Sequence, residues 1–258
     1  MIKKDFFLSV ILSMLLMPFL AFAQPAPVPQ SSSEQDAQSL LSAFMSYTDL
    51  RIRSVQQGLE ILASTSEAGS GKWEKMKELL SGYQNSDVGF IVWYARPDGS
   101  FYTVDKGLMD VKASDRSYFP DLMAGKKIIG PLVISKSTSQ RSTVIAVPIQ
   151  KDGKVVGAIG ASLFLDQLAE QINSVLVLRT DGTFFALAPN GVATLHRKTE
   201  RHFLDPRELG SETLKKAMNQ MLSSSSGEVT YEFDNTTKKA IYRTSPLTQW
   251  RFAIEFSE

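Results

Sequence analysis

The residues best suited to hold a small molecule lie in the stretch ASDRSYFPDLMAG. Arg116 presents a planar fork of N–H donors that can bind a carboxylate through two hydrogen bonds. Tyr118 can add a hydroxyl donor and an aromatic wall, and Phe119 can add an apolar wall. One arginine among aromatic rings is what a pocket for a small organic acid requires. The same spacing allows an alternative. Arg116 would form a surface ion pair with Asp115 or Asp121, and both aromatic residues would pack in the core.

The sequence contains no pattern typical of catalysis, a metal site or a cofactor. His196 and His202 are the only histidines, and they lie six residues apart, whereas helical metal pairs need a spacing of three or four. We therefore predict that both belong to a charged surface loop. There is no cysteine, which excludes disulfides, thiolate metal ligands and a lipid-anchored cysteine. No nucleophile elbow, P-loop or dinucleotide motif occurs, so we expect neither enzymatic activity nor a cofactor.

Composition and charge are those of an ordinary globular protein. The 258 residues are 43% hydrophobic and 21% charged, with a net charge of +1. Lys3, Lys4 and Asp5 together contribute +1, which leaves about zero for residues 24–258. A neutral chain offers no general attraction to nucleic acid or to anionic membranes.

The N-terminus has the pattern of an export signal. Lys3 and Lys4 precede the apolar run FFLSVILSMLLMPFL, and residues 21–23 form an A-x-A cleavage site. We expect cleavage after Ala23 and a periplasmic mature chain, because an exported protein without cysteine suits that compartment. The alternative is an uncleaved helix anchored in the inner membrane, although a stable span needs about 20 apolar residues. Residues 24–33, QPAPVPQSSS, are expected to form a mobile linker.

The elements that must position Arg116 follow in a regular order. Apolar residues at helical spacing predict one long helix from Ser33 to about Ser64 and a shorter one ending near Gly82. The pattern then becomes β-rich, with a hairpin expected around Pro97-Asp98-Gly99. A short helix in YFPDLMAG and a later one in LDQLAEQI flank strands in IIGPLVIS, STVIAVPIQ and KVVGAIGASLFL.

The pattern then restarts. The segment R-x-D-G-x-F-F at residues 179–185 matches R-x-D-G-x-F-Y at residues 96–102, and predicts a second hairpin around Asp181-Gly182. A loop over residues 193–210, a helix in SETLKKAMNQML and a strand in GEVTYEF follow. The final KAIYRTSPLTQWRFAIEF echoes the earlier closing strand pair. We therefore predict an α+β fold with a long N-terminal helix and two units, each an antiparallel sheet flanked by helices.

This order resembles the double Cache arrangement, a pair of PAS-like units found in extracytoplasmic sensors of bacterial chemoreceptors and histidine kinases. The best-matched parts are R-S-Y-F and P-I-x-x-D-G-K-x-V-G-x-I-G-x-S. The resemblance implies a first unit over residues 34–173, long helix included, and a second over residues 174–258. In that family an R-x-aromatic-aromatic motif in the first unit commonly holds a ligand carboxylate. The resemblance thus implies this role for Arg116, Tyr118 and Phe119.

Two departures from the family pattern bear on ligand and architecture. Members that bind amino acids usually place an aspartate on the last strand of the unit to hold the amine, and Ser162 stands there in this chain. A hydroxyl is a poor counter-charge for an ammonium, so a simple carboxylate or an uncharged polar ligand fits better. Family receptors also continue into a transmembrane helix and an output domain, which this sequence lacks after Glu258, and we expect a free-standing binding protein.

Other residues are weaker candidates for the pocket, because a core or surface position explains each of them as simply. The second unit is expected to be structural support, since Arg201 precedes Phe203 by two residues but no second aromatic follows. The weaker pocket candidates are Trp93, which alternates with Tyr94 on a strand, Tyr102 on the partner strand, and Ser135 with Ser137 after GPLV.

We therefore predict a periplasmic, sensor-type protein of chemotaxis or signal transduction that binds a small carboxylate in its first unit. The alternative is a partner-binding protein with a vestigial pocket. In that case the long helix would form a homodimer or dock on a membrane sensor.

Overall fold

The computed structural model describes residues 32–85 and 89–258. The expected signal peptide, and the linker up to residue 31, lie outside the described residues. The long helix is confirmed as α1, Ser32–Ala63, so the last two residues of the predicted linker belong to it. Within the described ranges, no helix is both long enough and apolar enough to cross a membrane.

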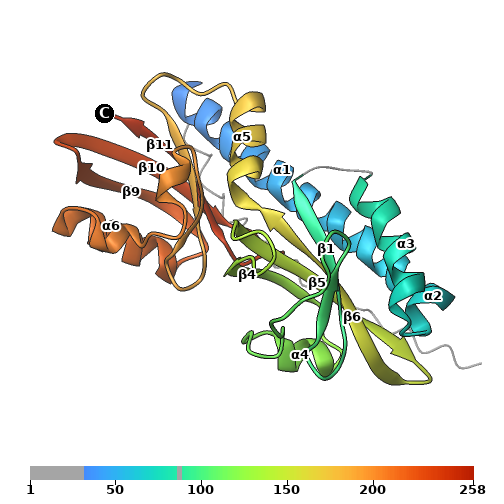
Figure 1. The fold of residues 1–258 in the computed structure, drawn as a ribbon. Coiled ribbons are helices and arrows are strands. Elements are labelled where there is room, and N and C mark those ends of the chain that lie inside the picture. Colours follow the sequence, from blue (N-terminus) through green and yellow to red (C-terminus); the bar gives the residue numbers. More distant parts are fainter. Residues whose placement is uncertain (1–31, 86–88) are drawn as a thin grey trace, which may run out of the picture. The chain divides into compact units, whose positions relative to one another are not determined.

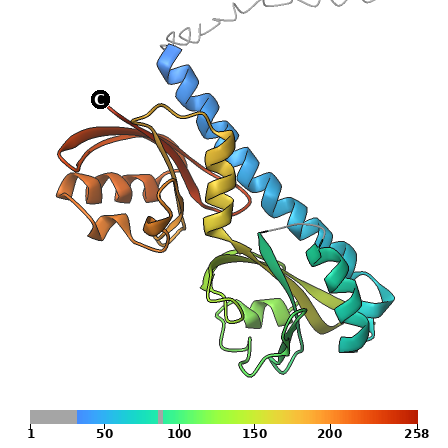
Figure 2. The same cartoon turned by 45° about the horizontal axis from the view of Figure 1, so that its top comes forward.

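Helix α1 contacts the strands of both sheets along its length (Figures 1 and 2). Its buried residues recur every three or four positions, which is the spacing of one helix face. These residues are Leu41, Phe44, Thr48, Ile52, Val55 and Leu59. Two helices follow, α2 Ser66–Gly69 and α3 Trp73–Asn85, and α3 runs three residues beyond the predicted end near Gly82.

The first sheet has six antiparallel strands in the order β3-β2-β1-β6-β5-β4. Helix α3 covers one face beside β1, and the short helix α4, Phe119–Met123, covers the other face over β5 and β6. The two faces therefore belong to different cores, one shared with α1 and one closed by α4. The strands are β1 Phe90–Ala95, β2 Phe101–Thr103, β3 Gly107–Leu108, β4 Ile128–Ile134, β5 Arg141–Lys151 and β6 Lys154–Phe164.

The second sheet has five antiparallel strands in the order β8-β7-β11-β10-β9. Helix α5, Leu165–Val175, leads into it, and helix α6, Glu212–Ser223, covers the face opposite α1 (Figure 1). Two short 3-10 turns, η1 Thr199–Arg201 and η2 Pro206–Glu208, lie between β8 and α6. The strands are β7 Thr183–Leu187, β8 Ala193–His196, β9 Ser226–Phe233, β10 Thr236–Thr244 and β11 Arg251–Ser257.

The predicted hairpin around Asp181-Gly182 is wrong. Residues 176–179 form no strand, and β7 instead pairs with β8 around a turn at Asn190-Gly191, where Gly191 has φ +94°. The reason lies in the pairing, because β11 and β8 occupy both edges of β7 and leave no edge for residues 176–179. The segment predicted as a loop over 193–210 thus contributes the edge strand β8.

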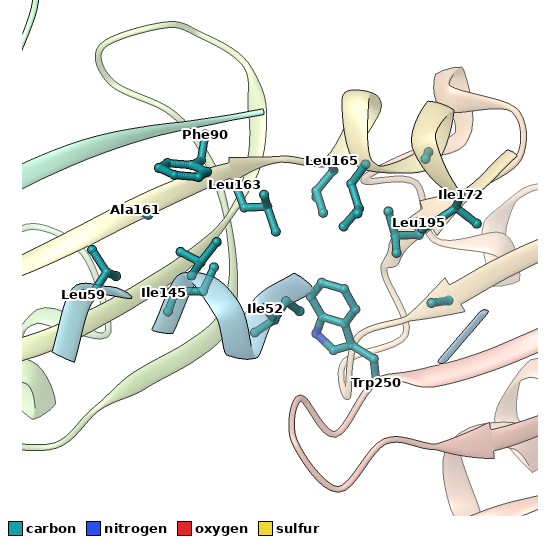
Figure 3. Packing of buried hydrophobic residues seen from close by; sticks show 14 of the residues in the cluster. Ile52, Leu59, Phe90, Ile145, Ala161, Leu163, Leu165, Ile172, Leu195 and Trp250 are labelled. Carbon is teal, nitrogen blue, oxygen red and sulfur yellow. The ribbon is translucent and has the colours of Figure 1, made fainter. Parts of the chain in front are cut away.

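The main core joins α1, α5 and both sheets (Figure 3). The ring of Phe44 lies 4.9 Å from the ring of Phe184 and 4.9 Å from that of Phe252, which fixes α1 against the second sheet. Ile52 of α1 and Trp250, which precedes β11, belong to the same cluster. The scaffold of two sheets on one helix, predicted from the repeated pattern, is therefore confirmed.

Candidate ligand-binding site

A cavity opens on the α4 face of the first sheet. It lies between β1, β6, the end of β4 and the loop that precedes α4. Six of the eight predicted site residues line it, and they come from four separate segments of the chain. They are Trp93, Arg116, Tyr118, Ser135, Ser137 and Ser162.

Arg116 is positioned by two backbone turns. Its N–H donates to the Ala113 carbonyl at 3.0 Å, and its carbonyl accepts from the Phe119 N–H at 2.9 Å, just where α4 begins. The side chain reaches across to β4, where Nη2 donates to the Ile134 carbonyl at 2.7 Å. One donor of the guanidinium is used in this bond, and a guanidinium has five. The others can serve an anion in the cavity.

The neighbouring acids pair with lysines rather than with Arg116. Lys136 Nζ lies 2.6 Å from the Asp115 carboxylate, and Lys126 Nζ lies 2.8 Å from the Asp121 carboxylate. The hydrogen bond from Lys136 holds the pKa of Asp115 below its ordinary value. Within the described part of the chain Arg116 forms no ion pair, so the surface pair that its spacing also allowed is not formed.

Aromatic side chains form the walls. The Trp93 indole lies over Gly160, where a Cβ would come within 2.1 Å of it, so only glycine allows this packing. Burial raises the pKa of Tyr118 to about 12, which keeps its hydroxyl protonated as a donor. Together they make a largely dry wall beside the Arg116 guanidinium.

Serine hydroxyls supply the remaining polar groups. Ser135 and Ser137 are both buried, and their hydroxyl oxygens lie 3.2 Å apart. Ser162 is buried on β6, opposite Val144 and Ile91 in the sheet register. Among the described residues that line the cavity, Arg116 and Lys136 are cationic and none is an aspartate or glutamate. The arrangement therefore favours an anionic or neutral polar molecule.

Tyr102 and Phe119 do not line the cavity. Tyr102 pairs with Tyr94 in the sheet and faces the other side, where its ring stacks on Trp73 with centroids 4.7 Å apart. Phe119 is buried in the cluster beneath the cavity together with Leu122. Alternation along β2 explains the first case, because adjacent strand residues face opposite sides.

The comparisons with known proteins agree with this geometry. A profile of the Cache domain family, dCache_1, matches residues 30–258. The chain belongs to the double Cache family. Members of this family are extracytoplasmic, non-enzymatic modules that bind ligands.

One relative is a chemotaxis receptor. The chain is 26% identical over 201 residues to the methyl-accepting chemotaxis protein McpB of Bacillus subtilis. The aligned region covers 75% of this chain and 28% of that receptor. It therefore spans little more than a quarter of the length of that relative.

Two solved structures share the double Cache fold at low identity. The ligand-binding domain of the Pseudomonas aeruginosa chemoreceptor PctB, in complex with L-Arg, matches with a TM-score of 0.69 and 17% identity over 88% of this chain and 94% of that one. The sensory domain of Campylobacter jejuni Tlp3, with isoleucine bound, matches with a TM-score of 0.66 and 14% identity over 88% and 93%.

Several residues that line the first Cache cavity were not predicted. The strand register could have identified Phe101. Thr103 is opposite Trp93, and Phe101, two residues before Thr103 on β2, faces the same side of the sheet. The others come from loops and strand ends whose course the local pattern does not determine. They are Ala113, Val133 and Lys136.

The prediction of a surface loop for the two histidines is wrong. His196 is 7% exposed and His202 is 2% exposed. His202 Nδ1 lies 2.6 Å from the Asp166 carboxylate at the start of α5, and Arg141 Nη2 donates to the same carboxylate at 2.8 Å. His202 is thus buried beside Asp166, whereas His196 is buried on the α6 face of the second sheet, where its ring stacks on Phe185. Among the described residues, no group of three or more side chains could hold a metal ion.

Proposed function

We propose that the first Cache unit binds a small organic carboxylate that carries no ammonium group, and that Arg116 clamps it. The observation that supports this most directly is the charge of the cavity: Arg116 lines it without an ion-pair partner, and the described lining contains no acid. A carboxylate would accept from the guanidinium and from the Tyr118 hydroxyl, while Trp93 and Phe101 shield the pair from water. Phe119 would act indirectly, by packing beneath Tyr118.

Because the described lining contains no aspartate or glutamate, we expect the cavity to prefer a carboxylate without an amine over an amino acid. PctB and Tlp3 were solved with L-Arg and isoleucine, each of which carries an ammonium group. An ammonium taken out of water needs a carboxylate partner. On this sheet face Ser162 offers only a hydroxyl group. The desolvation cost of binding is therefore lower for a carboxylate without an amine than for an amino acid.

The test is a thermal-shift screen of residues 24–258 against small carboxylates, amino acids, amines and purines. A carboxylate without an amine is expected to stabilise the protein, by about 2.7 kcal/mol at 100 times its dissociation constant. Arg116→Ala is expected to weaken binding about 10- to 100-fold, because a hydrogen bond to a charged group is lost.

Two further variants sharpen this test. Lys126→Ala, a surface cation of the same unit, is expected to bind as the parent does. Ser162→Asp is expected to shift preference from the carboxylate toward the amino acid of the same side chain, because it supplies an acid on the lining. A carboxylate whose binding survives Arg116→Ala would place the site elsewhere and refute the clamp.

We also propose that the chain is exported and works in the periplasm. The positive residues, apolar run and A-x-A site at the N-terminus support this. The expected result is that protein recovered from a periplasmic extract begins at Gln24 on N-terminal sequencing. An N-terminus at Met1 in the membrane fraction would favour the anchored alternative.

A second candidate function is partner binding through α1. Leu50 and Ile61 are each 68% exposed, and their separation of eleven residues places them on one side of the helix. An exposed apolar pair of this kind suits a helix–helix contact with a second copy or with a membrane sensor. If the screen finds no ligand and light scattering shows a stable dimer, this function replaces the first.

A further inference from the structure

The second Cache unit contains a cavity of its own. It lies between the second sheet, α6 and the segment after β8. Its interior is apolar, with Leu187, Leu214 and Met218 among the lining residues. Leu204 and Leu209 line it as well, although they are 41% and 44% exposed. An apolar lining with a few polar groups is typical of a small-molecule site.

Two hydrogen-bond donors meet in this cavity. His196 Nδ1 accepts from the Lys198 N–H at 2.8 Å, so its Nε2 carries the hydrogen of the neutral ring. That Nε2 lies 3.5 Å from Arg201 Nη1, and neither of two donors can accept from the other. An acceptor placed between them would satisfy both.

The charge of Arg201 is weakly compensated. Its nearest carboxylate is that of Asp234 at 3.8 Å, and the Asp234 side chain is 74% exposed, so water screens the pair. The guanidinium otherwise lies 4.8 Å from the centre of the Phe233 ring. The buried acid of the cavity, Glu255, is engaged by the Tyr231 hydroxyl. A ligand anion would therefore be the close partner of Arg201.

We propose that this second cavity binds a small monocarboxylic acid with an apolar body, whose carboxylate bridges Arg201 and His196 Nε2. The branched or aromatic body would lie against Leu187, Leu214 and Met218. The proposal does not depend on the carboxylate site of the first unit, because the cavity belongs to the other sheet and shares no residue with it.

The test uses the ring nitrogens of the two histidines as reporters, since the chain has only these two. Histidine-labelled protein is titrated with 3-methylbutanoate, 3-methylbutanol and 3-methylbutylamine, which share one apolar body and differ in the head group. The carboxylate is expected to shift the His196 Nε2 resonance in a saturable manner, and the alcohol to bind at least tenfold more weakly. Binding in the first cavity would leave this resonance unchanged, so the two proposals can fail separately.

Three variants complete the experiment. Arg201→Gln is expected to weaken 3-methylbutanoate at least tenfold, whereas Lys215→Gln, a change of an exposed cation on α6, is expected to have no effect. Leu204→Trp, at a partly exposed position, is expected to obstruct the cavity without disturbing the core. No shift at His196 up to millimolar carboxylate would overturn the proposal, and so would tighter binding of the amine, which would assign recognition to Glu255.

Discussion

Replacing Phe44 by alanine is expected to lower the free energy of unfolding by about 3–5 kcal/mol, the range for removing a buried phenylalanine. Phe44 is completely buried, and its ring contacts the rings of Phe184 on β7 and Phe252 on β11. The truncation leaves a cavity between α1 and the second sheet, because these strands are paired on both sides and cannot collapse into the space.

The measurement is urea denaturation of the purified protein, followed by circular dichroism. Gln57→Ala is the matched control, since Gln57 lies exposed on the same helix, and such a change is expected to cost less than about 0.5 kcal/mol. A loss for Phe44→Ala as small as that of the control would mean that α1 does not pack against the second sheet in solution.

Acid is expected to destabilise the protein strongly through the buried histidines. Burial, with Arg201 nearby, lowers the pKa of His196 from 6.5 to about 3. The unfolded chain therefore takes up a proton near pH 6.5, whereas the folded chain does not. The contribution of neutral His196 to the free energy of unfolding is therefore fully present above pH 6.5. It falls by up to about 1.4 kcal/mol per pH unit on acidification toward pH 3.

Other buried groups modify this acid profile. Burial also lowers the pKa of His202, against the opposing hydrogen bond to Asp166, so it adds a loss of the same sign. Burial raises the pKa of Glu255 and of Asp49. Their protonation in the folded state opposes the histidines as the pH falls. The slope for the whole protein is therefore the sum of these opposing contributions.

A comparison with His196→Gln isolates the contribution of this one residue, because glutamine does not titrate. The free energy of unfolding is measured at pH 7.5, 6.5, 5.5 and 4.5 for both proteins. The difference between parent and variant is expected to shrink by about 1.4 kcal/mol per unit below pH 6.5. A difference that stays constant with pH would show that His196 titrates alike in the folded and unfolded chains.

The sequence alone was sufficient for most of the order of elements. The 3.6-residue repeat of α1 and the alternating strands are local properties, since each depends on side chains a few positions apart. The DRSYF stretch, together with the family resemblance, also predicted Arg116 and Tyr118 for the pocket, and both line the first cavity. Their role in binding stays a prediction.

Only the tertiary structure decided which face each residue occupies. Phe101 and Tyr102 are equally aromatic, and the pairing of β2 with β1 alone turns the first toward the cavity and the second toward Trp73. β7 pairs with β11, whose residues lie 64 to 72 positions further along the chain, so the local D-G signal gave the wrong hairpin. His196 and His202 look like loop residues in sequence, and only the tertiary structure buries His202 beside Asp166 and His196 against Phe185. Pairing and burial of this kind depend on long-range contacts, which the local sequence pattern does not contain.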